Sequence, residues 1–169
     1  MKQISIIFPN QLFEESPILD FKCEILMLED SLFWGNDKKY KCINHINKII
    51  FLRSAMYSYR EYLQKSGFKV IYGFNEKNFD TSDYLSKYQV ENYDNVNIIE
   101  PHDYLLSRRL NNFLKKNNIK VNILNSPMFL INDVLKNKFE ANNKKPLICL
   151  LYTSPSPRDR ISSRMPSSA

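Results

Sequence analysis

Polar side chains follow several short apolar runs in this chain, and their types could bind a small polar molecule. The side chains in question are Asn10, Gln11, Glu29, Asp30 and His102. Amide and carboxylate groups hydrogen-bond the hydroxyl and amine groups of small ligands. In an open parallel sheet, ligands bind beyond the carboxyl ends of the strands, near the point where the strand order reverses. If the apolar runs are strands of such a sheet, these side chains form the rim of a ligand pocket.

Each of these groups also has a purely structural interpretation. Pro9 and Asn10 form a common turn pair, and Glu29 with Asp30 resembles the acidic pairs found in solvated loops. Trp34, the chain's single tryptophan, and its neighbour Phe33 could stack on a flat ring, although core packing is the simpler explanation of each. The residue types alone leave both interpretations open.

Familiar catalytic motifs are absent from the sequence. The glycines are Gly35, Gly67 and Gly73, so neither a GxGxxG turn nor a P-loop can form. No GxSxG motif occurs either. His45 and His102 have no partners at zinc-ligand spacing, which favours ordinary hydrogen-bonded or surface histidines. The residues therefore predict a ligand crevice and identify no reaction.

Strands that alternate with helices are expected to position these side chains. Runs rich in β-branched residues predict strands at residues 3–8, 24–28, 69–72, 96–99 and 120–124. Segments of helical period predict helices at residues 45–66, 81–88, 104–116 and 131–139. This alternation is typical of βαβ units. The predicted fold is therefore α/β, a Rossmann-like doubly wound parallel sheet of about five strands with helices on both faces.

Composition and charge favour a soluble protein of the cell interior. The net charge is +6, and the basic residues are spread along the chain without the block that marks a nucleic-acid-binding arm. The apolar run at residues 4–8 is far too short to span a bilayer, so no membrane partner is expected. Cys23 and Cys42 show no CxxC spacing, and no signal peptide precedes them. These features predict a cytoplasmic location in a reducing compartment.

Residues 149–169 differ from the rest of the chain. They are rich in serine and proline, follow no helical or strand period, and resemble a translated sequencing adapter. We therefore predict an α/β domain over residues 1–146 and an adapter-derived, disordered tail over residues 149–169, with the chain as the front piece of a longer protein. A genuine disordered Ser/Pro tail is the alternative.

A set of further segments occurs in an order and spacing that chance does not easily produce. They are residues 6–13, 25–30, 45–56, 62–63, 67–70, 100–101 with Tyr104, and 126–130. Together they resemble the amino-terminal domain of the photolyase-related branch of the cryptochrome/photolyase family, the branch that includes bacterial iron–sulfur photolyases. The resemblance covers nearly all of the chain before residue 149.

The resemblance implies a role for the pocket at the strand ends. In that family the domain is Rossmann-like and holds an antenna pigment, commonly a ribityl-lumazine. The implied antenna contacts are Pro9, Asn10, Gln11, Glu29, Asp30, Phe33, His45 and Lys48. A lumazine has a flat ring for aromatic contact, and amides and carboxylates can hydrogen-bond its ribityl hydroxyls.

The resemblance also implies partners that this sequence does not contain. In the family, a downstream helical domain holds FAD and a 4Fe–4S cluster, and it would be the packing partner of this domain. The complete protein would be a light-driven DNA photolyase that repairs pyrimidine photoproducts in damaged DNA, or a related photoreceptor. The α/β domain alone is not expected to be active.

Two other functions remain open from the residues. One is a free-standing Rossmann-like nucleotide-binding or interaction module that carries no flavin. The other is an enzyme of the wider nucleotide-binding α/β group that acts on an adenylate, although the lack of a glycine-rich phosphate turn argues against it. A long helical continuation with cysteine ligands would favour the photolyase-like function, and a natural stop soon after Pro146 would favour the free-standing module.

Overall fold

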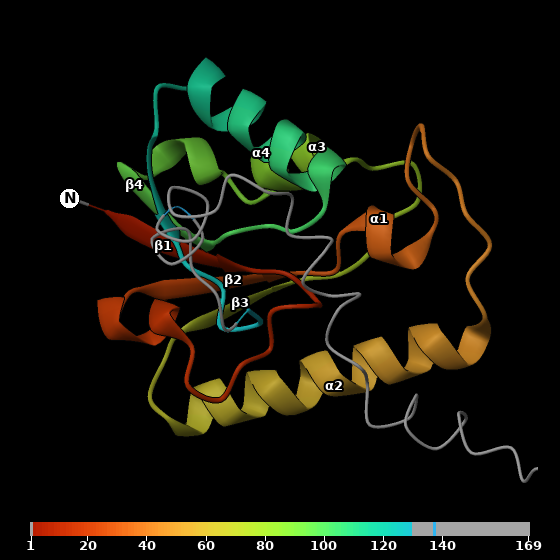
Figure 1. The fold of residues 1–169 in the computed structure, drawn as a ribbon, viewed down its shortest axis with the longest axis horizontal. Coiled ribbons are helices and arrows are strands. Elements are labelled where there is room, and N and C mark those ends of the chain that lie inside the picture. The colour runs from red at the N-terminus through yellow and green to blue at the C-terminus, as the bar shows by residue number, and fades with distance from the viewer. Residues whose placement is uncertain (1, 130–136, 138–169) are drawn as a thin grey trace, which may run out of the picture. The chain divides into compact units, whose positions relative to one another are not determined.

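Five parallel strands form a single sheet in the computed structural model, which describes residues 2–129 and residue 137. The strands are β1 (Gln3–Ile7), β2 (Glu24–Leu28), β3 (Val70–Gly73), β4 (Asn95–Ile99) and β5 (Lys120–Leu124). Their order across the sheet is β3-β2-β1-β4-β5, and every neighbouring pair is parallel (Figure 1). The α/β fold predicted from the alternation of elements is confirmed.

Helices cover both faces of this sheet, as Figure 1 shows. The long helix α2 runs along one face, whereas α3 and α4 cover the other. Three shorter elements connect strands and helices. The bounds are α1 (Ser31–Trp34), α2 (Ile46–Lys65), α3 (Thr81–Lys87) and α4 (Tyr104–Lys116), with the 3-10 helices η1 (Pro17–Phe21) and η2 (Val90–Asn92).

The alternating side chains of β1 divide the core into two halves. Ile4 and Ile6 pack with Leu110 of α4 on one face of the sheet. Ile7 packs with Met56 of α2 on the other. Successive side chains of a strand point to opposite faces, and all of these residues are buried. Burial on both faces explains why the central strands appear in the sequence as unbroken apolar runs.

The predicted elements match the observed ones with small shifts at their ends. The strand predicted at residues 3–8 ends at Ile7, and the strand predicted at residues 69–72 runs from Val70 to Gly73. The helix predicted at residues 45–66 is α2, which His45 caps. The helix predicted at residues 131–139, the domain end at residue 146 and the tail at residues 149–169 lie outside the described residues.

Two observations bear on the expected environment of the protein. The helices that the structure describes include none that is both long enough and apolar enough to cross a membrane. Cys23 and Cys42 both carry free thiols.

Candidate functional site

The strand order reverses between β1 and β4, and the predicted polar groups lie at the carboxyl ends of neighbouring strands. From β1 the chain moves outward to β2 and β3, and β4 then joins β1 on its other side. Loops that leave adjacent strands in opposite directions open a crevice, where sheets of this class bind ligands. Asn10 and Gln11 follow β1, and Glu29 and Asp30 follow β2. The crevice therefore lies at the carboxyl ends of β1 and β4, and the candidate site extends from the end of β1 along the same edge to the end of β2.

Gln11 joins the end of β1 to the end of β4. Its side chain is only 1% exposed. The amide Nε2 donates to the carbonyl oxygen of Ile99 at 3.1 Å, and Oε1 accepts the backbone N–H of Phe8 at 3.3 Å. Both ends of the Gln11 amide are thus engaged by the backbone. In this structure Gln11 holds the turn at Pro9 and Asn10, and buried Pro9 lies within that turn.

Glu29 is the centre of a buried hydrogen-bond network. The guanidinium of Arg53 binds it in bidentate fashion, with Nε to Oε1 at 2.8 Å and Nη2 to Oε2 at 2.6 Å. The Tyr72 hydroxyl also donates to Oε1 at 2.8 Å, and the Asn75 backbone N–H donates to Oε2 at 2.9 Å. Glu29 is fully buried, so these four donors replace its water. The network fastens α2 and the loop after β3 to the end of β2.

The same network alters the proton affinity of its neighbours. Burial and the hydrogen bond to Glu29 raise the pKa of Tyr72 well above its ordinary value. The hydrogen bond to the Glu29 carboxylate raises the pKa of Arg53. Arg53 therefore remains a cation and Tyr72 a neutral hydrogen-bond donor at every physiological pH.

Asp30 caps the single turn of α1. Its Oδ1 accepts the backbone N–H of Leu32 at 2.9 Å. The other oxygen, Oδ2, has no hydrogen-bond partner of normal geometry among the described residues, although the Thr81 hydroxyl acts on the same carboxyl group. Asp30 is fully buried. Burial raises the pKa of Asp30, and the Leu32 N–H and the Thr81 hydroxyl offset only part of that effect.

Replacing Asp30 with asparagine is expected to stabilise the protein at neutral pH by about 1 kcal/mol, because a buried charge is removed while an amide oxygen can still cap α1. A carboxyl group whose pKa is raised on folding contributes stability below its unfolded pKa, near 3.8. That contribution is lost as the pH rises through the folded pKa. Urea unfolding followed by circular dichroism measures this from about pH 4 to pH 8. The free energy of unfolding of Asp30→Asn should rise relative to that of the wild type as the pH increases.

The matched control for this prediction is Asp103→Asn, the same change at the exposed cap of α4. It should leave the free energy of unfolding at neutral pH within about 0.5 kcal/mol of the wild type. If Asp30→Asn were less stable than the wild type at neutral pH, the Asp30 carboxylate would be a stabilising charge. That result would contradict the conclusion that burial raises the pKa of Asp30.

The side chain of Asn44 contacts Phe33 and Lys48, and His45 is the next residue in the chain. The Asn44 amide donates to the Phe33 carbonyl oxygen at 2.9 Å, and its Oδ1 accepts from Lys48 Nζ at 3.0 Å. His45 is exposed, and its Nδ1 accepts the backbone N–H of Asn47 at 3.2 Å, which caps α2. The structure therefore joins the backbone of Phe33 to the start of α2, where His45 and Lys48 lie.

The buried polar atoms that have no hydrogen-bond partner among the described residues include, besides Asp30 Oδ2 and Thr81 Oγ1, two on the segments after β1 and β2. They are Asn10 Oδ1, an acceptor, and Trp34 Nε1, a donor. Asn10 lies in the segment after β1 and Trp34 in the segment after β2, which pairs with β1. The Arg53 guanidinium lies 5.8 Å from the centre of the Trp34 ring. Because buried polar groups are nearly always hydrogen-bonded, these two atoms are the candidates for contact with a ligand.

His102, the remaining candidate from the sequence, lies at the ends of β4 and β5. Its Nε2 is 2.9 Å from the hydroxyl oxygen of Ser126, a buried residue that follows β5. The Ser126 hydroxyl oxygen also accepts the Met128 N–H at 3.3 Å. His102 thus takes part in a contact that joins the loops after β4 and β5.

Comparison with known proteins identifies the family of this chain. The family described as "Deoxyribodipyrimidine photo-lyase-related protein" matches residues 5–154. An uncharacterized protein of Acanthamoeba polyphaga mimivirus is 37% identical over 140 residues, which cover 79% of this chain and 69% of the viral protein. The photolyase-related family predicted from the sequence segments is confirmed. The matched region contains all the residues of the candidate site, and the chain belongs to the deoxyribodipyrimidine photo-lyase-related protein family.

Proposed function

We propose that this chain is the antenna-binding domain of a photolyase-like flavoprotein, and that a ribityl-lumazine binds at the carboxyl edge of β1 and β2. The observation that carries the proposal is the unpaired Asn10 acceptor and the unpaired Trp34 donor on segments that leave neighbouring strands. The polar atoms of a lumazine and its ribityl hydroxyls can complete both hydrogen bonds while the ring lies against an aromatic surface. Membership of the photolyase-related family supports the same assignment.

The site residues divide into two roles under this proposal. The residues assigned to direct contact with the pigment are Asn10, Phe33, Trp34, His45 and Lys48. Gln11, Glu29 and Asp30 would position the surrounding backbone, since most of their polar atoms are engaged within the protein. A pigment bound there would absorb light and pass the excitation energy to a redox cofactor of the complete protein.

The proposal assigns FAD and the 4Fe–4S cluster to residues beyond the printed sequence. Four cysteine thiolates hold such a cluster, and this sequence has three cysteines. The part of the chain that the structure describes has no group of three or more His, Cys, Asp or Glu side chains placed to hold a metal ion. Light-driven repair of damaged DNA, or light sensing, would require both parts of a cytoplasmic protein.

An apolar surface at the start of α2 is the proposed contact with the downstream helical part. Ile43, in the loop before α2, is fully exposed, and Ile46 and Ile50 are each more than half exposed. Ile46 and Ile50 are four residues apart, so they lie on the same face of the helix. Neighbouring exposed apolar side chains of this kind mark an interaction surface.

Titration of the protein into a ribityl-lumazine, followed by the fluorescence of the pigment, tests the proposed function. Saturable binding is expected, and Asn10→Ala should weaken it about tenfold, because the acceptor of one buried hydrogen bond is lost. Asn92→Ala is the matched control, since Asn92 is exposed and precedes β4 at the opposite edge of the sheet. Binding that Asn10→Ala and Asn92→Ala leave equally strong would place the pigment elsewhere.

A further inference from the structure

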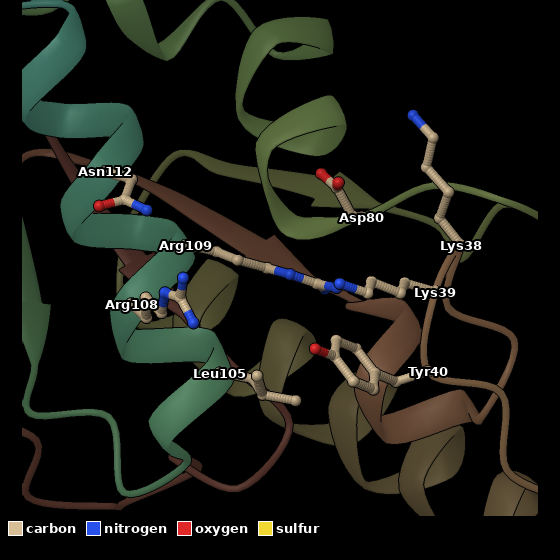
Figure 2. A pocket seen from close by; sticks show the side chains of 8 residues that line it. All are labelled: Lys38, Lys39, Tyr40, Asp80, Leu105, Arg108, Arg109 and Asn112. Carbon is tan, nitrogen blue, oxygen red and sulfur yellow. The ribbon is translucent and has the colours of Figure 1, made fainter.

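A pocket of about 430 Å³ lies between the turn after α1 and the face of α4. Its lining residues are Lys38, Lys39, Tyr40, Asp80, Leu105, Arg108, Arg109 and Asn112. Figure 2 shows Arg108 and Arg109 reaching from α4, with Lys39 and Tyr40 opposite them on the turn. The volume is in the range of small-molecule sites. We propose that this pocket binds the phosphate group of a small phosphorylated molecule.

The charges of the pocket leave two cations available for such a ligand. Lys38 pairs with Asp83 at 3.6 Å, and Arg109 is held by a buried carboxylate. Lys39 and Arg108 have no ion-pair partner among residues 2–129, and both line the pocket. The two charges come from segments far apart in the sequence. They converge on one cavity because the fold places the turn against α4.

The carboxylate of Asp80 offsets only part of this positive charge. Its Oδ1 accepts the backbone N–H groups of Ser82 and Asp83 at 2.9 and 3.1 Å, which caps α3. The carboxylate is thus committed to the end of the helix. It leaves the pocket with an excess of positive charge.

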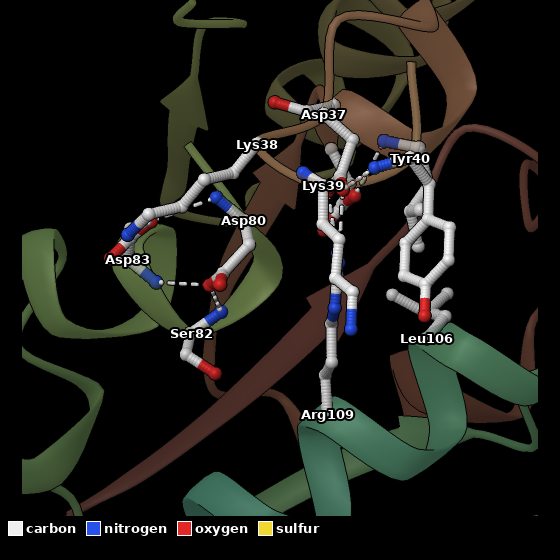
Figure 3. Close-up of polar contacts among 12 residues, drawn as sticks. Asp37, Lys38, Lys39, Tyr40, Asp80, Ser82, Asp83, Leu106 and Arg109 are labelled. Atoms are coloured by element: carbon white, nitrogen blue, oxygen red, sulfur yellow. Dashed lines mark hydrogen bonds and ion pairs between the residues drawn. The ribbon is translucent and has the colours of Figure 1, made fainter. Parts of the chain in front are cut away.

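Asp37 joins the two walls of the pocket through hydrogen bonds, which Figure 3 shows as dashed lines. Asp37 is fully buried. Arg109 Nη1 donates to Oδ2 at 2.6 Å and Nη2 donates to Oδ1 at 2.9 Å. The same Oδ1 accepts the backbone N–H groups of Lys39 and Tyr40 at 3.0 and 2.8 Å. One carboxylate therefore fixes the backbone of the turn and the Arg109 side chain of α4, so the two segments that carry Lys39 and Arg108 are in place before a ligand binds.

A phosphate monoester of a small molecule fits this arrangement better than a nucleic-acid strand. Arginine and lysine donors together favour phosphate oxygens, and the Asn112 amide adds a neutral donor at the same wall. A strand needs an uninterrupted row of cations along its backbone. Asp80 and Asp83 interrupt any such row beside the pocket.

Calorimetric titration at constant ionic strength, with inorganic phosphate, AMP and adenosine as probes, tests the proposal. Saturable binding of phosphate and AMP is expected, with none for adenosine. Arg108→Gln and Lys39→Gln should each weaken AMP binding about tenfold, the effect of one lost charge-assisted hydrogen bond. Lys115→Gln removes the same charge from α4 outside the pocket and should change nothing.

Any one of the following results would overturn the proposal. The first is equal weakening by Lys115→Gln, which would indicate attraction to net charge alone. The second is adenosine binding as tightly as AMP, or no saturable binding of any probe. The third is an oligonucleotide that binds more tightly than AMP and displaces it. Thermal unfolding of each variant, followed by circular dichroism, confirms folding before titration, and Arg108 and Lys39 are both exposed enough to be replaced without loss of the fold.

Discussion

Arg109→Ala is expected to lower the free energy of unfolding by about 3–5 kcal/mol, because it leaves the buried Asp37 carboxylate without its countercharge. Arg109 is itself mostly buried, with 15% of its side chain exposed, so little water can replace the guanidinium. Urea unfolding followed by circular dichroism measures the loss. Arg108→Ala, one residue earlier on α4 and exposed, is the control and should change stability by less than about 0.5 kcal/mol.

The pH dependence of the same variant gives an independent test. Burial alone would raise the pKa of Asp37, but the hydrogen bonds from Arg109 and from the Tyr40 and Lys39 N–H groups outweigh it and hold that pKa below 3.8. A carboxyl group with a depressed pKa contributes stability above its unfolded pKa, and that stability is lost as the pH falls through the folded pKa. Without Arg109, the effect of burial on the pKa of Asp37 dominates. The difference in the free energy of unfolding between Arg109→Ala and the wild type should therefore become smaller as the pH falls towards the unfolded pKa.

A double-mutant cycle separates the lost pair from general damage to the fold. Asp37→Asn in the Arg109→Ala background removes the stranded charge, so the double variant should be more stable than Arg109→Ala alone. The contrary result is a double variant that is less stable than Arg109→Ala by the whole effect of Asp37→Asn measured alone. It would show that Arg109→Ala does not leave Asp37 as a buried charge.

Arg53→Ala is the second large effect, with an expected loss of about 2–4 kcal/mol in the free energy of unfolding. Glu29 would remain fully buried with only the Tyr72 hydroxyl and the Asn75 N–H as donors. The loss should be smaller than for Arg109→Ala, because 43% of the Arg53 side chain is exposed and water can screen the site.

The conservative variant Arg53→Lys distinguishes charge from geometry. Lysine keeps the cation but cannot donate two parallel hydrogen bonds to one carboxylate, so an intermediate loss of stability is expected by urea unfolding. If Arg53→Ala lay within about 0.5 kcal/mol of the wild type, Glu29 would have to be reached by water and the buried network would not exist.

The positions of the site residues could be predicted from the sequence, but their partners could not. Gln11 and Glu29 follow apolar runs, and the alternation of strands and helices is enough to place both at one edge. The bonds that engage Glu29 come from Arg53 and Tyr72, which lie 24 and 43 residues away in the chain. No local pattern encodes such tertiary contacts, so Arg53 was missed as part of the site.

The segment after β2 shows a second limit of local prediction. The turn α1 is only four residues long, which is too short for a helical period to be visible. It forms because Asp30 caps its first turn and Gly35 closes it at a φ of 79°. A Cβ atom at Gly35 would lie 2.1 Å from the Cys42 carbonyl oxygen, so the close return of the loop requires glycine there. Asp30 and Gly35 are the two local signals that could have indicated this turn.

The unpaired indole nitrogen of Trp34 could not be predicted from the sequence either. Core packing, the simpler interpretation of this residue, is confirmed by its 7% exposure and its place in the core cluster on the α2 side. Its unpaired Nε1 is the additional feature, and it depends on which neighbours the fold supplies. The sequence shows an aromatic residue near a strand end, whereas only the fold shows a buried donor without an acceptor.

The most direct measurement of the central claim is the fluorescence of Trp34, the single tryptophan of the chain, during titration with a ribityl-lumazine. Saturable quenching with one pigment per chain is predicted, because energy transfer to a pigment bound anywhere on so small a domain quenches the indole. The same titration of Asn10→Ala should reach its midpoint at an about tenfold higher pigment concentration. Trp34 emission that does not change on addition of the pigment would contradict the claim that this α/β domain holds an antenna.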